Sequence, residues 1–166
     1  MLVLYHATVR SCLRLSRLFT YTQVMEKLQK VATAVVVNEQ DEVLMIKRVK
    51  REVSKSGNTL TLVFPGGKQE GEESAAETAV RETDEETGCK VAPEKIIWEG
   101  PHPEFPVYMS YVACKLTEIS DSPTDDEDVA EVYWIPRSQL AETVTTKVNP
   151  FVQAYLDSLS QNSTDN

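Results

Sequence analysis

Three glutamates in the middle of the chain have the type and spacing to hold a metal ion. Glu82, Glu85 and Glu86 stand at positions i, i+3 and i+4, so a helix would place their carboxylates on one face. Like charges at this spacing repel one another, and a bound hard cation reverses the sign of that interaction. Taken alone, however, three such residues fit a solvated acidic helix face better than a metal site.

The chemistry that such a cluster supports is cleavage of a phosphoanhydride bond. Mg²⁺ takes oxygen ligands and retains several waters, which leaves room for the phosphate oxygens of a substrate. The ion offsets charge on the bridging oxygens while a water molecule attacks phosphorus. The three glutamates therefore indicate a metal-assisted hydrolase, provided that the residues around them support it.

The helix that would carry the glutamates has clear signals at both ends. Ser74 and Glu77 form an S-x-x-E capping box, and Gly88 supplies a C-terminal stop. We therefore expect a helix over residues 74–87.

The segments on either side of this helix have the patterns of strands and short helices. Together they predict an α/β (α+β) fold. Before the helix we expect strands over residues 31–37, 43–47 and 59–64 and a charged loop over 47–57; after it, strands over 90–98, 107–116 and 130–135, a short helix following Pro136 and a last helix over 150–159.

The helix and its flanks resemble the Nudix box, G-x5-E-x7-R-E-U-x-E-E-x-G-U, where U is a bulky apolar residue. Residues 66–89 read GGKQEGEESAAETAVRETDEETGC. Thr83 and Cys89 take two of the apolar positions. Cys89 suits a small buried site, whereas Thr83 is expected to loosen the packing of the helix against the sheet. Every fixed position of the box is filled, by Gly67, Glu73, Arg81, Glu82, Glu85, Glu86 and Gly88.

The resemblance implies a mixed β-sheet between helices, with the box as a loop–helix–loop, and Mg²⁺ as the cofactor, with Mn²⁺ as a substitute. Arg81 and Glu73 are then an orienting ion pair, although such a pair is also an ordinary surface salt bridge. The implied metal ligands are the carboxylates of Glu82, Glu85 and Glu86 and the backbone carbonyl of Gly66.

The general base is left open by the resemblance, because relatives differ in this respect. Some use the position of Glu82, and others use a carboxylate from a distant loop. The acidic run 125–128 places Asp128, with Glu127 before it, where many relatives carry a loop glutamate. Asp128 is therefore a candidate ligand or base, although most acidic runs are solvated loops.

Four further residues are candidates for substrate binding. Arg48 and Lys68 could neutralise phosphates, or could be ordinary surface charges. Phe64, in the sequence FPGGK, resembles the aromatic residue beside the base pocket in the mutator-protector 8-oxo-dGTP hydrolases, but it could equally be a core residue. Asn149 resembles a base-reading Asn of that group, and it is also well placed to cap the last helix.

Composition narrows the class of protein. The chain has 166 residues with 41% hydrophobic content, which fits one domain. It contains no apolar run of the roughly 20 residues that a membrane span requires. A net charge of −9 disfavours binding to nucleic-acid polymers. Three scattered cysteines without CxxC spacing argue against a zinc site and favour a cytoplasmic location.

The first 30 residues differ from the remainder, with five basic side chains and one acidic side chain. Three interpretations remain open: an extension ahead of a start at Met25, a targeting peptide, or a helix docked on the domain. We favour the first. The domain is then expected over residues 31–159, with residues 160–166 as a disordered tail.

Three functions are compatible with these features. The first is a hydrolase that converts a nucleoside triphosphate, ordinary or oxidised such as 8-oxo-dGTP, to monophosphate and pyrophosphate. The second is a hydrolase of nucleoside diphosphate sugars of the ADP-ribose type. The third is a non-catalytic nucleotide sensor, which would not need three metal-binding carboxylates. In each case the partner is a small nucleotide, and the protein is a monomer or a homodimer.

Overall fold

The computed structural model describes residues 28–53, 57, 59–119, 127–144 and 147–161. Among these, no helix is both long and apolar enough to cross a membrane. The predicted extension over residues 1–30 lies almost wholly outside the described residues, as does most of the tail. The elements are β1 (Gln29–Val36), β2 (Glu42–Val53), β3 (Thr59–Val63), β4 (Gly66–Lys68), α2 (Ala75–Thr87), β5 (Cys89–Pro101), β6 (Val107–Ile119), β7 (Val129–Pro136), a 3-10 turn η1 (Arg137–Gln139), α3 (Leu140–Thr143) and α4 (Pro150–Gln161).

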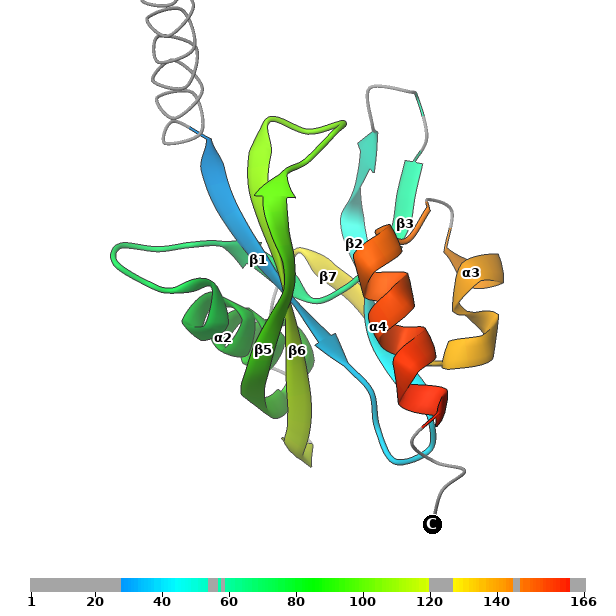
Figure 1. The fold of residues 1–166 in the computed structure, drawn as a ribbon. Coiled ribbons are helices and arrows are strands. Elements are labelled where there is room, and N and C mark those ends of the chain that lie inside the picture. Colours follow the sequence, from blue (N-terminus) through cyan, green and yellow to red (C-terminus); the bar gives the residue numbers. More distant parts are fainter. Residues whose placement is uncertain (1–27, 54–56, 58, 120–126, 145–146, 162–166) are drawn as a thin grey trace, which may run out of the picture.

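The strands form two sheets, which helices cover (Figure 1). One sheet has the order β4-β1-β6-β5 and the other has the order β3-β2-β7. β1 pairs in parallel with β6, and the other pairings are antiparallel. The predicted α/β (α+β) fold is confirmed, with its strands divided between two sheets.

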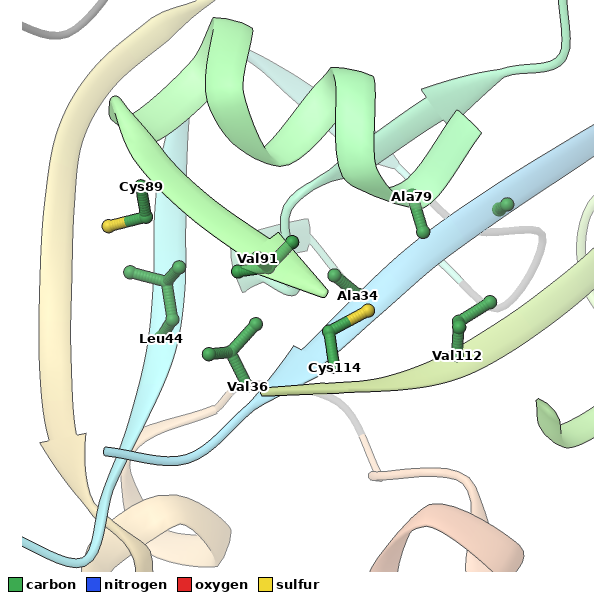
Figure 2. Packing of buried hydrophobic residues seen from close by; sticks show 9 residues of the cluster. Ala34, Val36, Leu44, Ala79, Cys89, Val91, Val112 and Cys114 are labelled. Atoms are coloured by element: carbon green, nitrogen blue, oxygen red, sulfur yellow. The ribbon is translucent and has the colours of Figure 1, made fainter. Parts of the chain in front are cut away.

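β1 lies at the centre because both of its faces are buried. Ala32, Ala34 and Val36 point into a cluster under α2, whereas Val35 points into a second cluster on the opposite face. This alternation follows from the two-residue period of a strand. Figure 2 shows the first cluster, in which Ala79 of α2 gathers with residues of β1, β2, β5 and β6. The helix that carries the glutamates is thereby anchored on the first sheet.

The second cluster joins the two sheets to the C-terminal helices. Val152 and Leu156 of α4 and Leu140 of α3 are fully buried there with Val43 and Met45 of β2. The expected short helix after Pro136 and the expected final helix are both present.

α2 begins and ends where its capping residues predict. The Ser74 hydroxyl accepts the Glu77 backbone N–H, and the Glu77 carboxylate accepts the Ser74 backbone N–H. Gly88 ends the helix in a left-handed conformation, with a φ of 70°. Both devices satisfy backbone groups that the helix itself leaves unpaired.

Thr83 does not loosen the helix, so that expectation is wrong. Its side chain is fully buried, and its hydroxyl donates to the Ala79 carbonyl at 2.6 Å. Thr87 donates in the same way to the Thr83 carbonyl at 2.6 Å. Because each hydroxyl is satisfied within the helix, a threonine can fill an apolar position without leaving an unpaired polar atom.

The loop expected over residues 47–57 is wrong in its first part. β2 continues to Val53, and Glu52 pairs with Leu60 and Val53 with Thr59 of β3. Backbone hydrogen bonding to β3 keeps this charged segment extended, which side-chain hydrophobicity alone does not reveal.

Candidate active site

The turn from Phe64 to Lys68 brings backbone atoms against both β1 and α2. β4 pairs with β1, so that Gly66 lies opposite Thr33. Gly66 has a φ of 154°, and a Cβ atom there would overlap the Ala32 carbonyl oxygen and lie 2.6 Å from Thr33 Cα. Only glycine fits at this position without moving the strand.

Gly67 makes room for a carboxylate of α2. A Cβ atom on Gly67 would lie 2.5 Å from Glu82 Oε2. The Glu82 side chain therefore lies directly over the backbone of the loop, and it is 15% exposed. The paired glycines fix how closely the loop approaches the helix.

Glu86 is the most deeply buried of the three glutamates. Its side chain is 3% exposed, and its Oε2 accepts the Gly66 backbone N–H at 2.6 Å. A guanidinium nitrogen of Arg48, Nη2, lies 3.2 Å from Glu86 Oε1 and donates to the Gly66 carbonyl at 2.6 Å. A buried carboxylate, a carbonyl oxygen and an arginine thus meet at one point.

Arg48 reaches this point from β2, where the sheet is irregular. Pairing with β7 shifts register between Lys47, opposite Glu131, and Arg48, opposite Val129. Irregularities of this kind change the direction of a side chain and are common beside active sites. The Arg48 side chain is 27% exposed, so it lies at the boundary between the interior and solvent.

Arg81 joins the other acidic groups of the motif. Its Nη1 donates to Glu82 Oε1 and to Glu85 Oε2, both at 2.9 Å. Its Nε and Nη2 form a two-point pair with Glu73 at 2.7 and 3.0 Å, and Nη2 also donates to the Lys68 carbonyl at 3.0 Å. Arg81 therefore connects the loop, a residue that precedes the helix and two glutamates of the helix, Glu82 and Glu85.

Glu73 orients Arg81, and its surroundings favour its charged form. The Arg81 guanidinium, and then the Glu70 backbone N–H, lower the pKa of Glu73 to about 2. The Thr78 hydroxyl also donates to Glu73, at 3.0 Å. The same ion pair raises the pKa of Arg81. Near neutral pH Glu73 is therefore an anion that holds the Arg81 cation in place.

Glu82 is in the opposite situation. Burial raises its pKa, and the nearby Arg81 guanidinium only partly offsets that effect. A carboxylate with a raised pKa accepts a proton more readily than an exposed one does. In this structure Glu82 therefore takes up a proton more readily than Glu73 does.

Two oxygen donors at this site are of the kinds that bind a hard divalent cation. Gly66 O and Glu86 Oε1 already converge on one cationic nitrogen, and oxygen ligands of these two kinds are what Mg²⁺ takes. Within the described residues no three acidic, histidine or cysteine side chains are gathered closely enough to hold a metal. Arg48 pairs with Glu86, whereas Arg81 pairs with Glu82 and Glu85, so the three carboxylates are held by two different arginines.

Asp128 immediately precedes β7 and lies beside the middle of β2, next to the strand position of Arg48. Its carbonyl accepts the Val49 N–H at 2.8 Å, and its carboxylate lies 3.4 Å from Lys50 Nζ. Both charged side chains of this ion pair are largely exposed. The structure thus brings Asp128 next to the part of β2 that carries Arg48.

The remaining candidates surround the loop and α4. Phe64 is half-buried and packs edge-on against Tyr111, with ring centroids 6.2 Å apart. Asn149 caps α4, because its Oδ1 accepts the Phe151 N–H at 2.9 Å. The Lys68 side chain is exposed.

An aromatic pair beside Asn149 was missed by the sequence analysis. Trp98 of β5 stacks on Phe151 of α4, with centroids 6.3 Å apart and an interplanar angle of 17°. Phe151 is largely exposed. The two residues are more than fifty positions apart in the sequence, so no local pattern relates them. Their aromatic character is the only feature of the sequence that indicates a contact.

Comparison with known proteins gives a consistent result. A family model described as the NUDIX domain matches residues 27–155. A comparison with curated proteins finds no match to this chain.

Several solved structures share the fold. The MutT protein from Methanosarcina mazei Go1 has 18% identity and a TM-score of 0.58, with 82% of this chain and 96% of that chain covered. A NUDIX hydrolase from Nitrosomonas europaea has 17% identity and a TM-score of 0.63, with coverage of 82% and 90%. An ADP-ribose pyrophosphatase from Streptococcus suis 89-1591 has 17% identity and a TM-score of 0.56, with coverage of 84% and 96%.

Proposed function

Because this chain belongs to the Nudix family of hydrolases, which act on acid anhydrides, we propose that it cleaves a nucleoside triphosphate to monophosphate and pyrophosphate with Mg²⁺. The substrate is an ordinary or an oxidised nucleotide, such as 8-oxo-dGTP. Mn²⁺ is the expected substitute for Mg²⁺, and the proposed setting is a cytoplasmic monomer or homodimer.

The observation that carries the proposal is the convergence of Gly66 O and Glu86 Oε1 on one cationic nitrogen. Glu82 and Glu85 lie on the same helix and would complete the metal ligands. When bound, the metal would withdraw charge from the phosphate oxygens and favour attack by water.

The protein's own groups have separate roles in this proposal. Arg81 holds Glu82 and Glu85, and Glu73 holds Arg81, so the carboxylates are oriented before substrate arrives. Glu82, whose pKa burial raises, accepts the proton of the attacking water; Asp128 is the alternative base. Arg48 and Lys68 neutralise the phosphate oxygens.

The choice of a triphosphate depends on the residues around the base site. The segment FPGGK and Asn149 support it, and Phe64 offers a ring edge beside Tyr111. The cap that Asn149 forms uses Oδ1, which leaves its side-chain amide N–H groups for a base. A diphosphate sugar of the ADP-ribose type remains the second candidate, since one of the proteins with this fold is an ADP-ribose pyrophosphatase.

The test is a substrate screen with Mg²⁺, scored by the identity of the products. Nucleoside triphosphates, oxidised triphosphates and ADP-ribose are each incubated with the protein. Monophosphate and pyrophosphate from a triphosphate would support the proposal. Preferential release of AMP and ribose phosphate from ADP-ribose would favour the second candidate, and nucleotide binding without turnover would favour a sensor.

A further inference from the structure

The Arg48 guanidinium occupies the position between two oxygens that the proposed metal also needs. Its Nη2 lies 2.6 Å from Gly66 O and 3.2 Å from Glu86 Oε1. Both oxygens are among the proposed metal ligands, so a single cationic nitrogen now satisfies two of them.

The two oxygens have little freedom to serve both cations. The Glu86 side chain is 3% exposed, and its other oxygen, Oε2, accepts the Gly66 N–H at 2.6 Å. The Gly66 carbonyl is likewise held by the pairing of its strand with β1. Neither oxygen can turn away from Arg48 without breaking a buried hydrogen bond, and two cations close together repel each other.

We propose that Arg48 and the divalent cation exclude each other from these oxygens, so that metal binding releases the Arg48 guanidinium. Arg48 then balances the buried charge of Glu86 in the metal-free protein and becomes available for a substrate phosphate once the metal is bound. A guanidinium matches phosphate oxygens well. The inference rests on the proposed function for its metal site.

Arg48 is placed where such an exchange is sterically feasible. It stands at the register shift of β2 and is 27% exposed, so it can turn toward solvent without disturbing a packed core. Its neighbour Val49 is exposed as well. Release therefore needs a change of side-chain rotamer and no rearrangement of the strand.

An alternative role for Arg48 predicts the opposite effect on metal affinity. If Arg48 merely orients Glu86 for the metal, its removal should weaken metal binding about 10- to 100-fold, as loss of an outer-shell partner typically does. If Arg48 competes with the metal, its removal should strengthen binding. The direction of the change therefore separates the two roles.

The first experiment measures Mn²⁺ affinity in the absence of nucleotide, by the electron paramagnetic resonance signal of free Mn²⁺. Wild type is compared with Arg48→Ala, and with Lys47→Ala as a matched control. Lys47 is the adjacent cation on β2 and pairs with the exposed Glu131 at 2.8 Å. We expect Arg48→Ala to bind Mn²⁺ on the order of tenfold more tightly, and Lys47→Ala to bind like wild type. Unchanged or weaker binding by Arg48→Ala would overturn the proposal.

Arg48→Ala removes the cation beside a buried carboxylate and could destabilise the protein, so a second experiment follows the wild-type protein. The ¹⁵N resonances of arginine guanidinium groups are followed in the wild-type protein during a Mg²⁺ titration, with Arg48 assigned from the spectrum of Arg48→Lys. As Mg²⁺ saturates the protein, we expect the Arg48 chemical shifts to change from values typical of a hydrogen-bonded guanidinium to values typical of a solvent-exposed one. Arg48 signals that do not change at saturation would refute the exchange.

Failure of this inference is distinguishable from failure of the proposed function. If the protein hydrolyses nucleotides but Arg48→Ala binds Mn²⁺ more weakly than wild type, the proposed function stands and the exchange is refuted. If the protein hydrolyses no nucleotide but Arg48→Ala binds Mn²⁺ more tightly than wild type, the exchange stands and the proposed function is refuted.

Discussion

At the scale of single residues, the site consists of carboxylates in different environments. Glu86 is buried and accepts a backbone hydrogen bond. Glu82 is largely buried over the loop, whereas Glu85 pairs with Arg81 and is largely exposed. These environments give otherwise identical side chains separate roles. The order of burial is the order in which we expect substitutions to affect metal binding.

Glu86→Gln tests the most buried ligand. The amide keeps an oxygen that can accept the Gly66 N–H, so the fold should survive, but the negative charge is lost. We expect turnover to fall on the order of a hundredfold or more, measured as kcat with Mg²⁺. Asp84→Asn is the control on the same helix. Its carboxylate lies 2.6 Å from Lys90 Nζ, and this ion pair is not part of the proposed site. Equal turnover in Glu86→Gln and wild type would defeat the metal-site assignment.

Glu73→Gln tests the pair that orients Arg81 and has a defined pH dependence. The pKa of Glu73 falls from an ordinary 4.5 to about 2 in the folded protein, so its charged form stabilises the fold. That stabilisation is present above pH 4.5 and is lost as the pH falls through about 2. We therefore expect Glu73→Gln to lower Tm at pH 7 and the difference from wild type to shrink between pH 4.5 and 2.

The control for this measurement is Glu72→Gln, which removes the same charge from an exposed neighbouring side chain. Its Tm should follow that of wild type over the same pH range. A Glu73→Gln deficit that is as large at pH 2 as at pH 7 would show that the charge of Glu73 is not what stabilises the fold.

At the scale of elements, the site depends on a glycine turn pressed between a strand and a helix. Gly66 contacts the backbone of β1, and Gly67 contacts a side chain of α2. Backbone cannot yield, whereas the end of a glutamate side chain can. The two adjacent glycines should therefore respond differently to the same substitution.

Gly66→Ala should lower the free energy of unfolding by ~1–3 kcal/mol or more, because the new methyl group would overlap the backbone of β1. Gly67→Ala should leave the free energy of unfolding close to that of wild type but should lower turnover about a hundredfold, since it displaces the Glu82 carboxylate. Urea unfolding and kcat with Mg²⁺ are measured for both variants. The reverse result, a stable Gly66→Ala or a fully active Gly67→Ala, would contradict the described packing.

At the scale of the whole molecule, one family domain contains both hydrophobic clusters. Helix α2 packs on the first cluster, and the C-terminal helices α3 and α4 pack on the second. β1 begins at Gln29. All of the basic N-terminal segment except its last two residues precedes these elements. We propose that it is an extension that the catalytic domain does not need for folding.

Deletion of residues 1–24, which leaves Met25 as the first residue, tests this proposal. We expect Tm and turnover to remain as in the full chain, because the part of each cluster that the structure describes comes from later residues. Thermal unfolding and the substrate assay are compared for the two proteins. A marked loss of Tm would instead support a helix docked on the domain.

The amino-acid sequence by itself determined the features that depend on local spacing. The ends of α2 followed from Ser74, Glu77 and Gly88, and the placement of the glutamates on that helix followed from helical periodicity. The family followed from the same few residues, because their spacing along one helix and its flanks is a property of the chain alone.

Only the tertiary structure decided which groups from distant segments meet. Arg48 and Glu86 are 38 positions apart, and no local pattern relates them. Their contact depends on how β2 pairs with β7 and on where Gly66 crosses β1. The division of the carboxylates between two arginines, and the burial that distinguishes Glu86 from Glu85, are consequences of packing. Local propensity acts over a few residues, whereas burial and ion pairing act across whatever the fold brings together.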